Sequence, residues 1–230
     1  MAQDLVMPAP PKANPAPGFT AVQPSPQETQ AESKSPLSQK ANPIDVLQSY
    51  PIEAARQHLG EMLDAAKLGG NLNLQDQVQA LAALRKPPRG DHRAALALSA
   101  QGSSALKSGN FEASAKLLEE ALRLDPSDAE GLNSLAFVRL KQHQLSSARN
   151  AALASLLLLP TRTATWANLA FILAEDGKLG SASSAFYLAY HFSKDKPETQ
   201  NYLQRLNSED AASTAGLKEA ASGALKLINR

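Results

Sequence analysis

The stretch LAFILAEDGKLGSA, residues 169–182, resembles the stretch LAFVRLKQHQLSSA at residues 135–148, which lies 34 residues earlier. The charged residues differ between the two copies, whereas the Leu, Ala and Phe residues at the start of each copy are the same. Such a pattern indicates buried positions, because packing restricts the size and polarity of a side chain more than solvent does. The chain therefore contains a structural unit of about 34 residues that occurs more than once.

The same period continues outside these two stretches. Small residues recur at positions where two helices of a hairpin would approach closely, and large residues recur between them. We call a set of equivalent positions, 34 residues apart, a column. One column contains residues that can adopt the left-handed backbone conformation of a tight turn, which is easy for Gly and tolerated by His. The columns predict three helical hairpins, at 95–128, 129–162 and 163–196. The turn column is Gly109, His143 and Gly177, and the small columns are residues 102, 136 and 170 and residues 114, 148 and 182.

This pattern of recurring residues resembles the tetratricopeptide repeat. In that family the first helix of each unit has Trp, then Leu, then Gly or Ala, then Tyr at its characteristic positions. The second helix has Ala, Phe and Ala, and a Pro closes the unit. The resemblance implies an all-α fold: a short right-handed α-solenoid of three helix-turn-helix units with flanking helices. The matching residues are Trp166, Leu169 and Ala170 in the third unit, and Gly102, Phe111, Ala121 and Pro126 in the first. The departures are Gln101 in place of Leu, Ala105 and Arg139 in place of Tyr, and Lys194 in place of Pro.

The segments on either side of the repeats have their own patterns. Residues 1–43 are rich in Pro, Ala and Gln and predict a disordered tether, because they contain almost nothing that could form a core. Residues 44–88 predict a helical hairpin that covers the N-terminal end of the stack, and 197–207 a capping helix at the other end. Residues 211–230 predict an amphipathic helix that packs on the solenoid, occupies its groove or pairs with another chain.

The composition argues against several partners. The formal charge of +1 comes from 23 basic and 22 acidic residues mixed along the chain, so we expect no nucleic-acid partner. The longest apolar run, residues 151–159, is far shorter than the ~20 residues that cross a bilayer. We therefore expect no direct membrane span and interpret this run as a buried helix.

Catalytic and metal-binding patterns are not found. The chain has no Cys, and its four His residues lie on separate predicted elements without metal-ligand spacing. The pair Glu119-Glu120 predicts a solvated helix face. We expect no enzyme activity, no metal and no cofactor.

The resemblance implies a concave groove lined by the first helices of the units. Phe137 and Phe171 are the most informative positions, since an aromatic ring facing the groove offers apolar area to a ligand. The alternative is that the C-terminal helix or the inter-helix core covers them, whereas Trp166 is expected in the core. The predicted groove consists of Ser103, Leu106, Glu130, Asn133, Phe137, Leu140, Lys141, Ala167, Asn168, Phe171 and Glu175.

The predicted ligand is an apolar helix or an extended hydrophobic peptide of a partner protein. Repeats of this family that grip a C-terminal carboxylate use Lys, Arg and Asn, but most of the corresponding positions here could not make such contacts. Those positions are Ser99, Ser103, Ser134, Ala164 and Asn168.

The function that these observations predict is a non-enzymatic adaptor in a bacterial envelope or in a secretion- or pilus-type assembly. An Ala-Gln-Asp start followed by a proline-rich tether is typical of a processed periplasmic protein whose leader was replaced by Met1. A periplasmic or envelope location is therefore expected, with the cytoplasm as the alternative. Two other functions stay open: a cytoplasmic chaperone for secreted hydrophobic subunits, and a self-assembling scaffold that dimerises through residues 211–230.

Overall fold

The computed structural model describes residues 45–68, 74–208 and 213–230, and the regular structure in these ranges is α-helical, as predicted. The predicted tether at 1–43 lies outside the described residues. The helices are α1 (Asp45–Gln48), α2 (Ile52–Lys67), α3 (Leu74–Ala83), α4 (His92–Lys107), α5 (Phe111–Leu124), α6 (Ala129–Lys141), α7 (Leu145–Leu158), α8 (Thr163–Glu175), α9 (Leu179–Phe192), α10 (Lys196–Asn207) and α11 (Ala215–Ile228).

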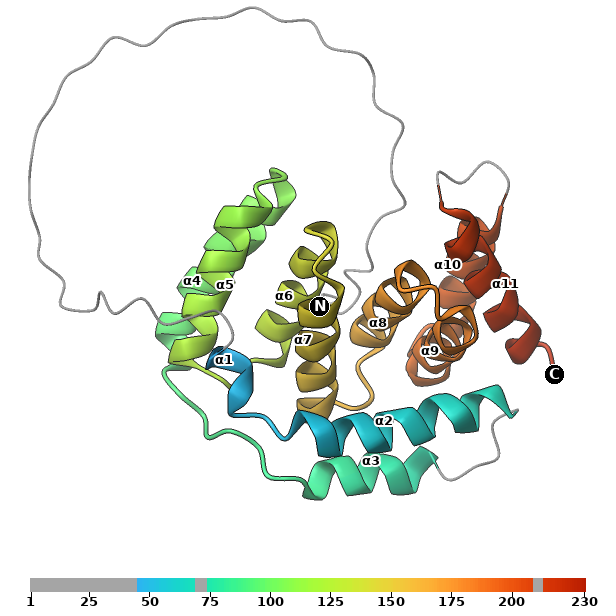
Figure 1. Cartoon of the computed structure of the whole chain (residues 1–230), viewed down its shortest axis with the longest axis horizontal. Coiled ribbons are helices and arrows are strands. Elements are labelled where there is room, and N and C mark those ends of the chain that lie inside the picture. Colours follow the sequence, from blue (N-terminus) through green and yellow to red (C-terminus); the bar gives the residue numbers. More distant parts are fainter. Residues whose placement is uncertain (1–44, 69–73, 209–212) are drawn as a thin grey trace, which may run out of the picture.

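Three antiparallel hairpins, α4–α5, α6–α7 and α8–α9, stand side by side along the molecule (Figure 1). Their turns contain the predicted column of left-handed residues, with φ of 78° at Gly109, 58° at His143 and 73° at Gly177. The small columns are buried and allow close approach: the Ser114 hydroxyl donates to the Gly102 carbonyl at 2.8 Å between α5 and α4. The periodic pattern therefore specifies the hairpins, as the sequence suggested.

The N-terminal hairpin does not cover the outer face of the first unit, contrary to the prediction. Instead, α2 packs across α7 and α9, and α3 packs on α2 and α7. The buried face of α2 contains Ala55, Leu59, Met62 and Ala66. The hairpin thus lies along the second helices of units two and three, below them in Figure 1.

The first unit explains why no cover is needed there. Leu135 and Val138 of α6 are buried, and so are their equivalents in α8, Leu169 and Ile172. In α4 the same columns contain Gln101 and Ser104, which are exposed. Polar side chains can face water, so the stack can begin at α4 without a covering element.

Glu119 is not on a solvated helix face, also contrary to the prediction. Its carboxylate accepts a hydrogen bond from Nη2 of Arg139, and both side chains are buried between α5 and α6. Nη1 of Arg139 also donates to Gln142 at 2.9 Å and to Gln144 at 2.8 Å. Buried charges are tolerated when they are paired and hydrogen-bonded, and this pair joins the first two units.

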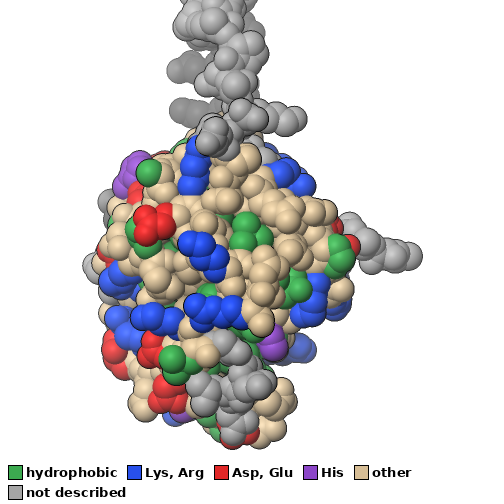
Figure 2. Space-filling model, turned by 90° about the vertical axis from the view of Figure 1, so that its right-hand side faces the viewer, with side chains coloured by type: hydrophobic (Ala, Val, Ile, Leu, Met, Phe, Trp, Pro, Cys, Tyr) green, Lys and Arg blue, Asp and Glu red, His purple; other side chains and the backbone are tan. Residues whose placement is uncertain are grey.

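The C-terminal helix packs on the stack, one of its three predicted roles. α11 contacts α9, α8 and α10, and it buries Ala220, Ala221 and Ala224. Gly223 is needed for this approach, because a Cβ there would lie 2.2 Å from Oγ of Ser183. Figure 2 shows this end of the molecule, where Lys and Arg side chains are spread over the surface and hydrophobic side chains form only small, separate patches.

Residues 151–158 of the apolar run belong to α7, and residues 151–157 are buried, as expected for a helix that packs against α6, α8 and α2. Leu159 follows the helix and is 47% exposed, so the predicted buried helix does not include the last residue of the run. Among the described helices, none combines the length and the apolar character required to cross a membrane.

Candidate functional site

The candidate binding surface is the side of the stack formed by the first helices of the hairpins, α4, α6 and α8. We call it the first-helix face. Neighbouring helices of this face are in contact, α4 with α6 and α6 with α8, whereas α2 packs on the second helices α7 and α9. The N-terminal hairpin is thus not packed on the predicted groove positions.

Two predicted groove residues pair with each other. Nδ2 of Asn168 on α8 donates to Oδ1 of Asn133 on α6 at 2.9 Å, and both side chains are buried. Leu140 and Ala167 are also buried. These four residues therefore contribute to packing between the helices rather than to the accessible surface.

Phe137 is the aromatic residue of this face that is available to a ligand. Its side chain is half-buried, and it is not one of the described side chains that pack against the core cluster. Nζ of the exposed Lys141, one turn further along α6, lies 5.2 Å from the centre of its ring. Phe137 and Lys141 therefore form a cation–π pair on the surface, with apolar ring area still uncovered.

Phe171 has a different environment, although it occupies the same column. Its ring meets the buried Phe186 of α9 edge to face, with 5.6 Å between the ring centres and 79° between the planes. The ring belongs to the half-buried side chains that pack against the core. For Phe171, the inter-helix core was thus the better of the two sequence interpretations.

The remaining predicted residues lie at the edges of the face. Ser103 and Leu106 on α4 are half-buried. Glu130 is exposed and pairs with Arg162, and Glu175 is exposed and bonds to Nδ1 of His143 at 2.6 Å. The accessible predicted residues are therefore Phe137 and Lys141 on α6, with Glu130 and Glu175 at the edges, whereas Leu106 packs against the core cluster.

Trp166 is in the core, as predicted. Its side chain is fully buried, and its Nε1 donates to the Pro160 carbonyl at 2.7 Å. The hydrogen bond joins α8 to the loop that precedes it.

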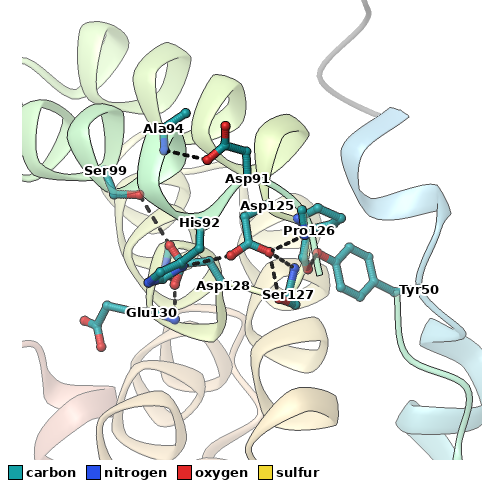
Figure 3. A network of polar contacts seen from close by, with 12 residues as sticks. Tyr50, Asp91, His92, Ala94, Ser99, Asp125, Pro126, Ser127, Asp128 and Glu130 are labelled. Atoms are coloured by element: carbon teal, nitrogen blue, oxygen red, sulfur yellow. Dashed lines mark hydrogen bonds and ion pairs between the residues drawn. The ribbon is translucent and has the colours of Figure 1, made fainter. Parts of the chain in front are cut away.

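The junction between the first two units is a network of polar contacts around Asp125 (Figure 3). Its carboxylate accepts hydrogen bonds from the Gly90 N–H at 3.2 Å and from the Ser127 hydroxyl at 2.7 Å, and it contacts Nδ1 of His92 at 2.9 Å. Burial alone would raise the pKa of Asp125, but these hydrogen bonds outweigh it and lower the pKa to about 2. The carboxylate is therefore ionised over the ordinary pH range and holds the loop before α4.

This pKa predicts an acid-sensitive junction. Because the folded-state pKa of Asp125 is below its ordinary value of 3.8, its contribution to stability is present above about pH 4 and is lost as the pH falls towards 2. We expect a loss on the order of 1–2 kcal/mol in the free energy of unfolding. Urea titrations of the native protein and of Asp125→Asn over this range measure it, and equal pH slopes would contradict it.

Among the described residues, no group of three or more His, Asp or Glu side chains is placed to hold a metal ion. The side chains of the first-helix face offer apolar and hydrogen-bonding contacts to a ligand.

Residues 95–128, which include most of α4, all of α5 and the loop after it, match the family model of the tetratricopeptide repeat. The chain contains a tetratricopeptide repeat. The family model covers the first unit, so the three-repeat count and the repeat boundaries stay predictions. No curated protein matches the sequence.

Similar solved structures include the Yersinia enterocolitica type III secretion chaperone SycD in complex with a peptide of the translocator YopD. It is 20% identical, covers 58% of this chain and 92% of its own, and has a TM-score of 0.46. MamA of Desulfovibrio magneticus RS-1, from residue 41 to its end, is 18% identical, covers 77% and 94%, and has a TM-score of 0.45. A MamA RS-1 double mutant is 16% identical, covers 77% and 96%, and has a TM-score of 0.44.

Proposed function

We propose that this protein is a protein-interaction adaptor that binds an apolar helix or extended peptide on its first-helix face. The observation that carries the proposal is Phe137, which is half-buried and pairs with Lys141 instead of packing against the core. An aromatic ring beside a cation suits a partner that places an apolar side chain on the ring. Ser103, the equivalent residue of the first unit, has a small side chain.

The proposal includes a place in an envelope-associated assembly of the secretion or pilus type. The Cys-free composition suits an oxidising compartment. Fractionation of cells that make the protein tests this part separately: recovery with the cytosol would contradict it and leave the binding surface unaffected.

Replacement of Phe137 by Glu is expected to weaken partner binding by roughly 10- to 100-fold, since burying an aromatic side chain contributes about 1.5–3 kcal/mol. The fold should be unchanged, because the ring does not pack against the core. The measurement is a crosslinking pull-down with the native protein and the Phe137→Glu variant, after circular dichroism has shown equal helicity.

The matched control is Leu68→Glu, which introduces the same charge at a residue that is 75% exposed at the end of α2. A photoreactive phenylalanine analogue at position 137, and another at position 68, identify which face touches the captured protein. Retention by the Leu68 variant and crosslinking from 137 support the proposal. If the Phe137→Glu and Leu68→Glu variants retained the partner equally, the proposal would be contradicted.

A further inference from the structure

A basic segment links α3 to α4. Residues 85–93 read RKPPRGDHR, with Arg85, Lys86, Arg89 and Arg93 against the single acid Asp91, a formal charge of +3 in a chain whose total is +1. All four basic side chains are exposed, and none of them has a hydrogen bond or ion pair within the described part of the chain. The charges are therefore concentrated and available.

The main chain that carries these charges is fixed to the first unit. Pro87 is buried, and the Asp91 N–H donates to the Leu124 carbonyl at 2.8 Å. Gly90 lies so close to the end of α5 that a Cβ would be 1.8 Å from the Leu124 carbonyl oxygen. The carboxylate of Asp91 accepts a hydrogen bond from Ala94 N–H and begins α4 (Figure 3). A partner would therefore bind without first having to order this loop.

A hollow of about 470 Å³ lies next to the segment. Its lining includes Arg89 and His92 from the segment, and Leu158, Leu159 and Arg162 from the end of α7 and the loop after it. Leu159 is 47% exposed, one of the few large apolar side chains that face solvent. The hollow thus offers apolar contact directly beside the basic segment.

The acidic residues of the hollow are already engaged. Asp125 contacts His92, Asp128 accepts from the N–H groups of Glu130 and Gly131 at the start of α6, and Glu130 pairs with Arg162. Asp125 and Asp128 keep their negative charge in these hydrogen bonds, so the hollow and the basic segment together have five basic residues against four acidic ones: Arg85, Lys86, Arg89, Arg93 and Arg162 against Asp91, Asp125, Asp128 and Glu130. The positive charge is therefore located on the basic segment, whose four basic side chains are exposed and have no acidic partner in the described part of the chain.

We propose that the basic segment and the hollow together form a second docking surface, which binds an acidic peptide segment containing Leu or a similar apolar side chain from another protein. The carboxylates would meet Arg85, Lys86, Arg89 and Arg93, and the apolar side chain would lie on Leu159.

The chemistry of the surface favours this occupant over two others. No Phe, Tyr or Trp lines the hollow, so bases of a nucleic acid would find no ring to stack on. Residues 1–44 of the chain contain three acidic and three basic residues, which is not complementary to a formal charge of +3.

The test is fluorescence anisotropy of a labelled synthetic peptide made of Glu-Glu-Leu repeats, with the full-length protein. The variant R85Q/K86Q/R89Q/R93Q removes the basic segment. K67Q/K107Q/R123Q/K226Q removes equal charge from exposed residues elsewhere. Leu159→Ser tests the apolar contact, and Phe137→Glu tests whether this surface is separate from the first-helix face.

Each exposed charge pair changes affinity by roughly 1.4- to 5-fold, so loss of all four basic side chains is expected to weaken binding by at least about fourfold. The charge-matched control should change it less than about twofold, Leu159→Ser should weaken it several-fold, and Phe137→Glu should leave it unchanged. The proposal would be overturned if the peptide did not bind, or if both charge variants lost the same affinity. It would also be overturned if single-stranded RNA or anionic phosphatidylglycerol vesicles bound more tightly than the peptide.

Discussion

Replacement of Glu119 by Ala is expected to lower the free energy of unfolding by about 3–5 kcal/mol, because it leaves the guanidinium of Arg139 buried without its charged partner. Both side chains lie between α5 and α6, where solvent cannot replace the lost contact. The measurement is a urea titration followed by far-UV circular dichroism and by the fluorescence of Trp166, the single Trp of the chain.

The next junction of the stack supplies the control. Thirty-four residues after Glu119 and Arg139, the chain has Leu153 and Leu173, which are both buried. The double variant E119L/R139L is therefore expected to be within about 1 kcal/mol of the native protein or more stable, as happens when a buried ion pair is replaced by well-packed apolar residues. A double variant as unstable as Glu119→Ala would show that the pair does more than fill this junction.

Replacement of Trp166 by Ala is expected to cost about 3–5 kcal/mol, since it opens a cavity in the centre of the third unit. The indole is fully buried, and its N–H donates to the Pro160 carbonyl. Thermal unfolding followed by circular dichroism measures the change, because the variant has no Trp fluorescence.

Trp166→Phe separates the two contributions of the side chain. It keeps an aromatic ring but removes the N–H, so it should cost clearly less than Trp166→Ala. If the two variants lost the same stability, the hydrogen bond to Pro160 would matter more than the volume of the ring, contrary to the prediction.

The local parts of this structure could be predicted because they depend on residues close in sequence. The columns with Gly109, His143 and Gly177 specify turns, and the small columns specify the contact between paired helices. The periodic pattern also identified Phe137 and Phe171 as equivalent. It could not distinguish them, because the edge contact of Phe171 depends on Phe186 in the next helix.

The errors concern contacts that periodicity does not encode. The position of α2 depends on which distant surface its apolar face meets, although Gln101 and Ser104 already indicated that the outer face of α4 is polar. Glu119 looked solvated because its partner Arg139 is in another unit. The basic residues at 85–93 were overlooked because the total charge was averaged over the whole chain, whereas binding depends on local charge.

The packing of α2 against α9 has a consequence for how the protein is made. Lys67 ends α2 and Leu179 begins α9, so the two helices are separated by more than 100 residues. At roughly 5–20 residues per second, the ribosome needs about 5–20 s to make the partner of α2 after α2 itself. Until α7 and then α9 have been made, the apolar face of α2 lacks part of its native contacts and is open to chaperones or to aggregation. Repeat arrays with contacts only between neighbours can fold from one end as they emerge from the ribosome. In this chain, folding is complete only when α9 has packed against α2, near the beginning of the chain.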